Sequence, residues 1–341
     1  MEIKQALFGK NMAELEQVAA ESGMPKFAAK QMADWLYRKR IADIADMTNL
    51  SAKHRELLAE RYEVGLSAPV RSQKSKDGAK KYLFEVAGKK QACIESVMIP
   101  EDDRTTLCVS SQAGCKMACV FCMTGRMGFL QQLTAAEILN QVFSIPETLQ
   151  LSNLVYMGMG EPMDNIDEVL KSLEVVTAPW GLAWSPTRVT ISTIGVLDGL
   201  RRFLDESRCH VAISLHSPFA EERRALMPMQ KAYPMADVLA LIRQHDWTGQ
   251  RRVSFEYTLF AGVNDSSKHA DALAKLLEGL ECRVNLIRFH QIPDSPLHGS
   301  SDFTIGKFRQ RLLARGVITT VRASRGEDIL AACGMLSTKK N

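Results

Sequence analysis

Three cysteines, Cys115, Cys119 and Cys122, follow one another at the spacing C-x3-C-x2-C. Three thiolates this close in the chain can bind three irons of a [4Fe-4S] cluster and leave the fourth iron open to a substrate or cofactor. A zinc site with a fourth His or Cys ligand is the alternative, although zinc ligands more often form close pairs separated by a long spacer. The spacing favours the iron–sulfur cluster over zinc, and both over a loop that binds no metal.

The remaining five of the eight cysteines lie outside this motif. Cys108 lies seven residues before it, and Cys333 lies near the C-terminus in the sequence Ala-Ala-Cys-Gly. Residue type alone predicts a small buried apolar side chain at each of the five, since that is the commonest state of a free cysteine. The three that match no motif keep that interpretation: Cys93, Cys209 and Cys282.

The elements around the motif alternate between strand and helix from about residue 106 onward. Apolar β-rich runs predict strands at 107–111, 153–157, 188–192, 210–215, 252–259, 283–288 and 317–322. Helices are expected between them, including 133–143, one that begins at Asn165, and 267–280. Capping boxes are expected at Thr134 with Glu137 and, in similar form, at Asn165 with Glu168. This order predicts a parallel sheet curled into a full or partial barrel, with the three-cysteine loop at the carboxyl end of its first strand.

The first 68 residues have a different texture, with helices expected at 12–20, 26–38 and 51–62. A basic stretch follows, in which a hairpin is expected around Lys76-Asp77-Gly78. Two acidic residues, Asp77 and Glu85, stand there against seven basic ones: Arg71, Lys74, Lys76, Lys80, Lys81, Lys89 and Lys90. An ordinary solvated lysine loop and an arm that contacts nucleic-acid phosphates both account for this charge.

Length and composition exclude several classes of protein. The 341 residues are 46% apolar and 24% charged with a formal net charge of +4, which excludes a disordered or low-complexity chain. At roughly 150 residues a domain, about two domains are expected. No apolar run approaches the roughly 18 residues of a membrane span, and the first residues lack the apolar core of a secretory signal. We therefore expect a cytoplasmic protein with no membrane association, whose cysteines are kept reduced.

Five segments, taken together with the cysteine motif, resemble one known family. They occur in the family's order at 108–115 (CVSSQAGC), 157–162 (MGMGEP), 191–195 (ISTIG), 213–216 (ISLH) and 329–334 (ILAACG). The chain resembles the RlmN/Cfr family of RNA methyltransferases within the radical S-adenosylmethionine superfamily. The resemblance implies an α/β fold, a partial (βα)6 barrel with a small helical N-terminal accessory domain and a β-hairpin extension. The implied boundaries are an RNA-binding helical domain at 1–68, the basic hairpin extension at 69–105, the barrel at 106–322, and a C-terminal segment carrying the methyl-accepting cysteine at 323–341.

The resemblance also implies a role for individual residues. Cys115, Cys119 and Cys122 would hold one [4Fe-4S] cluster, and S-adenosylmethionine would chelate its open iron. Cys333 would become S-methylated, Cys108 would resolve it through a transient disulfide, and Glu95 would accept a proton. The implied S-adenosylmethionine contacts are Gly160, Glu161, Ser192, Ser214, Leu215, His216 and His290, the last at a position where the family commonly has asparagine.

The implied reaction is methylation of carbon 2 of adenosine with two S-adenosylmethionine molecules per turnover. That carbon is electron-poor, so it requires a radical rather than a methyl-cation donor. The family's substrates are adenosine 2503 of 23S rRNA and adenosine 37 of certain tRNAs, and the implied partners are these RNAs and an electron donor such as flavodoxin, with the chain a monomer. Cfr-like methylation of carbon 8, or a non-catalytic zinc-containing RNA-binding protein, are the alternatives. Basic residues expected to contact RNA phosphates are the 71–90 stretch, Arg38, Lys39, Arg40, Arg322 and Arg325.

Overall fold

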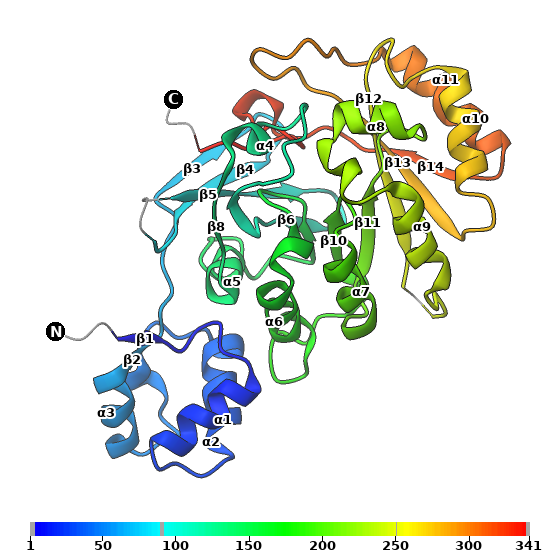
Figure 1. The fold of residues 1–341 in the computed structure, drawn as a ribbon. Coiled ribbons are helices and arrows are strands. Elements are labelled where there is room, and N and C mark those ends of the chain that lie inside the picture. Colours follow the sequence, from blue (N-terminus) through cyan, green and yellow to red (C-terminus); the bar gives the residue numbers. More distant parts are fainter. Residues whose placement is uncertain (1–3, 89–91, 250, 339–341) are drawn as a thin grey trace.

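A twisted ten-stranded sheet forms the centre of the molecule (Figure 1). The computed structural model describes residues 4–88, 92–249 and 251–338. Two of the basic residues counted above, Lys89 and Lys90, lie outside the described residues. The strand order is β14-β13-β12-β11-β10-β9-β6-β5-β4-β3, so parallel strands occupy one part of the sheet and antiparallel strands the other.

The parallel part is the expected partial barrel. Each strand pairs in parallel with its neighbours, and helices cover the outer face (Figure 1). The strands are β6 (Thr105–Cys108), β9 (Asn153–Tyr156), β10 (Val189–Thr193), β11 (His210–Ser214), β12 (Val253–Leu259), β13 (Cys282–Arg288) and β14 (Ile318–Val321). The helices are α5 (Ala135–Phe143), α6 (Ile166–Thr177), α7 (Leu197–Glu206), α8 (Ala220–Leu226), α9 (Met235–Gln244), α10 (Ser267–Leu276) and α11 (Asp302–Ala314).

Local sequence signals explain most of these elements. Strands β11 and β12 are buried along nearly their whole length, as expected for parallel strands covered on both faces. Helix α5 begins with the expected capping box, in which Thr134 accepts from the Glu137 N–H and the Glu137 carboxylate accepts from the Thr134 N–H. The second expected capping box is wrong. The Asn165 amide instead donates to the carbonyls of Ser111 and Leu133, at 2.9 and 2.7 Å, and so ties α6 to the loop after β6.

The basic hairpin continues the barrel sheet. Strands β3 (Arg71–Lys74), β4 (Lys80–Glu85) and β5 (Cys93–Pro100) are antiparallel, and β5 pairs with β6 so that Val97 lies opposite Cys108. The expected turn is present between β3 and β4, where Gly78 adopts φ +90°. A separate small sheet joins β7 (Gln112–Gly114) to β8 (Phe129–Gln132) and encloses the cysteine loop together with helix α4 (Met123–Met127).

The N-terminal helices form a lobe below the barrel (Figure 1). It contains α1 (Met12–Glu21), α2 (Ala28–Ala33), α3 (Ala52–Arg61) and the short parallel strands β1 (Gln5–Ala6) and β2 (Tyr62–Glu63). The helix expected at 26–38 is instead α2 followed by a π-helical turn, Asp34–Lys39. Aromatic rings fill the junction with the barrel, where Phe8 and Tyr37 contact Phe143 at centroid distances of 4.9 and 6.1 Å.

Two basic residues expected to contact RNA are bonded within this junction. Arg38 donates to the carbonyls of Pro179 and Gly181. Arg40 donates to the Thr148 hydroxyl at 2.6 Å and lies over the Phe143 ring. Both guanidinium groups therefore help to join the lobe to the barrel, Arg38 from an exposed position and Arg40 from a half-buried one. Among the described residues, no helix combines the length and the apolar character that crossing a membrane requires.

Candidate active site

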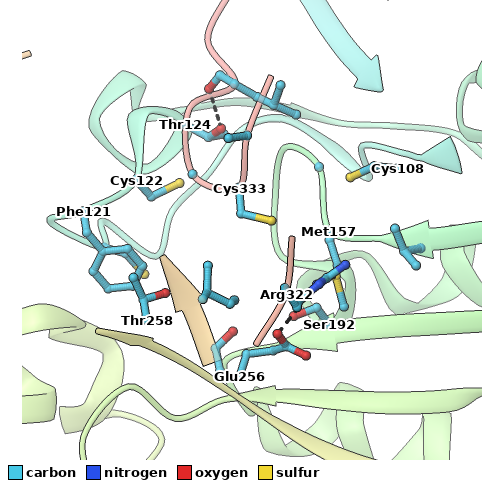
Figure 2. A pocket seen from close by; sticks show the side chains of 18 of the residues that line it. Cys108, Phe121, Cys122, Thr124, Met157, Ser192, Glu256, Thr258, Arg322 and Cys333 are labelled. Atoms are coloured by element: carbon cyan, nitrogen blue, oxygen red, sulfur yellow. Dashed lines mark hydrogen bonds and ion pairs between the residues drawn. The ribbon is translucent and has the colours of Figure 1, made fainter. Parts of the chain in front are cut away.

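A cavity of about 220 Å³ opens at the carboxyl ends of the parallel strands, between the cysteine loop and the C-terminal segment. This is the end of a βα barrel at which active sites form, because the loops that follow the strands converge there. Figure 2 shows side chains of the strand ends, the cysteine loop and the C-terminal segment directed into the cavity. Five thiols line the cavity: Cys108, Cys115, Cys119, Cys122 and Cys333. The structure therefore brings Cys333 to four cysteines that lie more than two hundred positions earlier in the sequence.

The three-cysteine loop runs from β7 to α4. Cys115 directly follows β7 and Cys122 is the residue before α4, while the Val120 N–H donates to the Leu226 carbonyl at the end of α8, at 3.0 Å. Burial raises the pKa of the Cys115 thiol to about 12. Burial and repulsion by the two other loop cysteines raise the pKa of Cys119, and burial and repulsion by Cys333 raise the pKa of Cys122. Three neighbouring thiols that resist ionisation need a cationic partner if they are to be thiolates together. A metal centre is such a partner.

This donor set fits an iron–sulfur cluster. Each thiolate on a cubane binds its own iron, so the three sulfurs need not converge on one point. A zinc site would need four ligands around one ion at about 2.0–2.3 Å. Within residues 4–88, 92–249 and 251–338, no three His, Cys, Asp or Glu side chains are grouped so that they could hold a single metal ion.

The segment after β9 supplies a carboxylate to the cavity wall. Gly160 has φ +99°, and a Cβ there would lie 2.4 Å from the Gln112 Cβ, so glycine is required. The Glu161 carboxylate accepts from the backbone N–H groups of Met163 and Ile194, at 3.0 and 2.9 Å, which joins the ends of β9 and β10. Burial raises the pKa of Glu161 to about 7. Glu161 lines the cavity, as do the expected cofactor contacts Ser192 and Ser214.

His216 follows β11 in a left-handed conformation with φ +56°. Its Nδ1 accepts a hydrogen bond from the Thr258 N–H at 2.9 Å, so the neutral ring carries its proton on Nε2. Burial and the nearby Arg223 lower the pKa of His216 to about 3, which keeps the ring neutral at physiological pH. Leu215 differs from its neighbours, because its side chain is fully buried in the core and does not line the cavity.

His290, expected to contact the adenosyl group, lines the cavity at the end of β13. Its Nε2 lies 2.7 Å from the Ser324 hydroxyl and its Nδ1 lies 3.1 Å from a Glu327 carboxylate oxygen. Both ring nitrogens therefore contact the C-terminal segment. In this chain His290 fastens that segment to the barrel as well as forming part of the cavity wall.

Cys108 and Cys333 face each other across the cavity (Figure 2). Cys108 is the last residue of β6 and is buried, whereas Cys333 is exposed, and both are free thiols. Burial and the neighbouring Cys333 raise the pKa of Cys108 to about 12, against the attraction of the Arg322 guanidinium. The exposed Cys333 thiol and the buried Cys108 thiol therefore line the same cavity.

The residues around Cys333 are held by other parts of the chain. The Gly334 carbonyl accepts from the Met123 N–H and the Leu336 carbonyl from the Thr124 hydroxyl, both at 2.8 Å. The β3–β4 turn adds a second attachment, which we call the hairpin clasp: Asp77 accepts from the Gly326 N–H at 2.7 Å, and Asp328 accepts from the Ser75 hydroxyl and the Lys76 N–H at 2.5 and 3.1 Å.

Glu95, the expected proton acceptor, lies beneath this segment. It is 5% exposed, pairs with Lys81 at 3.0 Å and accepts from the Ser337 N–H at 2.9 Å. Burial raises the pKa of the Glu95 carboxyl despite the attraction of Lys81. Val97 and Ile99 share its face of β5 and line the cavity, whereas Glu95 itself does not.

Arg322, expected to contact RNA phosphates, lies in the cavity wall. Its guanidinium is 3.0 Å from the Met157 sulfur and 3.6 Å from a Glu256 carboxylate oxygen. Glu256 Oε2 is buried without a hydrogen bond. Sequence analysis missed Glu256, although an acidic residue within the apolar run of β12 was an available signal. Arg325 also lines the cavity, with its Nε buried and unbonded.

The basic stretch is only partly available to a ligand. Lys80 pairs with Glu147 and Lys81 pairs with Glu95, so internal carboxylates hold both ammonium groups. Arg71, Lys74 and Lys76 are exposed. Of the basic residues in the described part of this stretch, these three are the ones a nucleic acid could reach.

Comparisons with known proteins agree with this geometry. Residues 109–274 match the model of the radical SAM superfamily, and residues 5–64 match the ribosomal RNA large subunit methyltransferase N-terminal domain. A probable dual-specificity RNA methyltransferase RlmN of Parabacteroides distasonis is 58% identical over 99% of this chain and 98% of its own length. A dual-specificity RNA methyltransferase RlmN of Syntrophus aciditrophicus is 39% identical over 96% of this chain and 95% of its own.

A solved structure shows the same fold. The crystal structure of a radical SAM methyltransferase from Sphaerobacter thermophilus superimposes with a TM-score of 0.90 at 39% sequence identity, and covers 98% of this chain and 100% of that one. The resemblance inferred from the motifs is therefore confirmed over nearly the whole length. The chain belongs to the RlmN family of dual-specificity RNA methyltransferases, within the radical SAM superfamily.

Proposed function

We propose that this chain methylates carbon 2 of adenosine in RNA, with Cys333 as methyl carrier and Cys108 as the thiol that releases the product. The observation that carries the proposal is the meeting of these two thiols in one cavity with the three-cysteine loop. The names of the relatives, dual-specificity RNA methyltransferases, support an RNA substrate. We propose adenosine 2503 of 23S rRNA and adenosine 37 of tRNA as the targets.

The residues that would hold the cofactors are those at the carboxyl end of the barrel. Cys115, Cys119 and Cys122 would bind three irons of a [4Fe-4S] cluster, and the strand-end residues would hold S-adenosylmethionine: Gly160, Glu161, Ser192, Ser214, the Leu215 backbone, His216 and His290. When bound, the two groups supply the 5′-deoxyadenosyl radical that removes a hydrogen atom from a methyl group. His216 presents an Nε2–H donor, and Arg322 presents a cation beside Glu256.

The chain's own thiols perform the remaining steps. Cys333 accepts a methyl group on its sulfur and, after hydrogen removal, its methylene carbon bonds to carbon 2 of the adenine ring. The ring then loses one electron, which a bound cluster would take back, and the proton on carbon 2. The Cys108 thiolate then attacks the Cys333 sulfur, the bond from that sulfur to carbon breaks, and its electron pair stays with the carbon, which is protonated to give the methyl product. The two thiols end as a disulfide. Burial raises the pKa of Cys108 to about 12 and so disfavours its thiolate. The positive charge of Arg322 acts in the opposite direction, stabilises the thiolate and thereby assists the attack.

We propose that Glu95 accepts the ring proton. Its raised pKa suits a base that must take up a proton near neutral pH. Both carboxylate oxygens are bonded, to Lys81 and to the Ser337 N–H. Glu95 can therefore reach substrate only when residue 337 moves away, which couples proton transfer to displacement of the Cys333 segment.

We further propose a monomer that acts in the cytoplasm, receives electrons from a donor such as flavodoxin, and contacts RNA phosphates through Arg71, Lys74 and Lys76. The helical lobe at 1–68 and the hairpin extension at 69–105 would form the RNA-binding side, with the barrel at 106–322 and the methyl-carrying segment at 323–341 completing the enzyme.

The test is analysis of iron, sulfide and methylated nucleosides with the anaerobically purified chain and RNA lacking the modification. We expect iron and sulfide at about four each and 2-methyladenosine as product, lost in Cys333→Ala and retained in Cys209→Ala, which removes a buried thiol at the opposite end of β11. 8-Methyladenosine would replace the proposal by Cfr-like chemistry. Stoichiometric zinc without product would replace it by the RNA-binding alternative.

A further inference from the structure

Helix α8 carries an arginine that is buried without a carboxylate partner. Arg223 is 1% exposed and is among the largest fully buried side chains in the described part of the chain. Its guanidinium donates to the carbonyls of Ile194, Ser214 and Leu215 at 2.9, 3.0 and 3.2 Å, and to the Gln230 side chain. No acidic side chain in the described part of the chain forms an ion pair with it. Burying an unpaired cation is costly, so this position requires an explanation.

The three carbonyls belong to the wall of the cavity. Ile194 follows β10, and Ser214 and Leu215 lie at the end of β11, next to the cavity-lining side chains Ser192 and His216. One guanidinium thus spans two neighbouring strand ends that a cofactor must contact together. The same helix ends at Leu226, whose carbonyl accepts the Val120 N–H of the cysteine loop. Helix α8 therefore connects both strand ends to the loop that carries the three thiols.

The negative charge that acts on Arg223 comes from that loop. Burial lowers the pKa of Arg223 to about 10, which leaves it cationic at neutral pH, and ionised Cys119 attracts it. A cubane with three thiolate ligands is anionic, and net charge near a cluster is one of the factors that set its reduction potential. A buried cation on this side would favour the reduced, more negative state.

A second buried arginine provides the comparison that isolates this effect. Arg251 is 7% exposed and donates to the carbonyls of Phe203, Leu204 and Cys209 at 3.3, 2.8 and 3.0 Å. Burial lowers its pKa to about 10 as well. It lies just before β12 and beside the start of β11, at the end of the barrel away from the cavity. Both arginines are buried and donate to three carbonyls, but Arg223 joins two strand ends at the cavity, whereas Arg251 joins the end of α7 to the residue before β11.

We propose that Arg223 is a positioning residue of the cofactor site, which braces the ends of β10 and β11 through its fork of donors and serves as the buried counter-charge of the cluster thiolates. This rests on the proposed function, because it requires a cluster on Cys115, Cys119 and Cys122. A lysine at position 223 would keep the charge, but its three donors on one nitrogen could not reproduce the bonds that three guanidinium nitrogens make to the three carbonyls and to Gln230.

The experiment compares Arg223→Gln, Arg223→Lys and Arg251→Gln as anaerobically purified full-length proteins with measured iron and sulfide. The cluster midpoint potential is measured by spectroelectrochemistry, and S-adenosylmethionine affinity by equilibrium binding. We expect Arg223→Gln to disfavour reduction about tenfold, a shift of 59 mV for one electron. Arg223→Lys should keep the wild-type potential but bind S-adenosylmethionine about tenfold more weakly, and Arg251→Gln should change neither.

Three results would overturn the proposal: a potential in Arg223→Gln equal to that of Arg251→Gln, a potential in Arg223→Lys shifted as far as in Arg223→Gln, or wild-type affinity in Arg223→Lys. If Arg223→Gln fails to fold, the affinity of Arg223→Lys against Arg251→Gln still decides the bracing role. Wild-type protein without iron and sulfide would instead refute the proposed function, so the two failures are distinguishable.

Discussion

The two walls of the cavity are held in place in different ways. The cofactor wall belongs to the barrel, where strand pairing, Arg223 and the Val120–Leu226 bond hold it. The Cys333 wall is a segment without a strand or long helix, attached by hydrogen bonds to residues more than two hundred positions away: Ser75, Asp77, Glu95 and Thr124. The first wall is built from strand ends of the sheet, whereas the second is an irregular segment that buries only a few apolar side chains, among them Ala331 and Leu336, against the core.

This difference matches the two tasks that the proposed reaction assigns. The cofactor wall must keep one geometry, so it uses buried contacts whose loss would disturb the core. The Cys333 wall must release Glu95 and follow its carbon to the RNA base, so individually weak, partly exposed bonds suit it. Its backbone turns at Gly326, Leu330 and Gly334, all with positive φ, instead of continuing in regular structure. The enzyme thus separates cofactor binding from the methyl-carrying thiol.

Removing one thiol from each wall should give the largest effects, and the two removals should abolish activity for different reasons. Cys119→Ala is expected to lose the cluster and all activity, because two thiolates cannot hold the cubane in place of three. Cys333→Ala is expected to keep iron, sulfide and S-adenosylmethionine binding and to lose all RNA methylation. Iron and sulfide analysis with a nucleoside assay measures both, and Cys282→Ala, a thiol outside the cavity, is the control. Cluster loss in Cys333→Ala would show that the walls are not separable.

The same division explains what the sequence could predict. The strands and their order along the chain could be predicted from apolar runs. The capping box could be predicted because Thr134 and Glu137 are only three positions apart. The Asn165 box failed because its amide found carbonyl partners at Ser111 and Leu133. The internal bonds of Arg38 and Arg322 could not be predicted, because their partners, the carbonyl of Pro179 and the carboxylate of Glu256, lie far away in the chain. Charged groups with distant partners are what local pattern cannot predict.

Loosening the hairpin clasp should give an intermediate effect on the Cys333 wall alone. Asp328→Ala removes the acceptor for both the Ser75 hydroxyl and the Lys76 N–H. We expect RNA methylation to fall about tenfold, because these charge-assisted bonds help to place Cys333, while the bonds from Met123 and Thr124 remain. Cys333 alkylation should become faster by a similar factor, and cluster content and S-adenosylmethionine affinity should not change.

The matched control for the clasp is Asp271→Asn. Asp271 is also a carboxylate bound to more than one donor, Arg311 and Arg315, but it lies on α10, outside the cavity. Rates of methylation and alkylation in this variant should equal those of the wild type. If Asp328→Ala behaves like Asp271→Asn, the clasp does not position Cys333, and the remaining bonds to α4 and Glu95 suffice.

The smallest expected effect concerns the outer side of the same turn. Lys76 donates its backbone N–H to Asp328, while its side chain is exposed, so Lys76→Gln removes a cation and leaves the clasp intact. If the side chain contacts one RNA phosphate, the dependence of log affinity on log salt should become shallower by about 0.7–0.9, and affinity at physiological salt should fall only a few-fold. Binding titrations at several salt concentrations measure the slope, with Lys275→Gln on the outer face of α10 as control.

Unchanged cluster content and Cys333 alkylation would show that the turn contacts RNA and the Cys333 wall independently. An unchanged slope would assign the phosphate contacts to other residues, and faster alkylation would show that the lysine side chain itself belongs to the clasp.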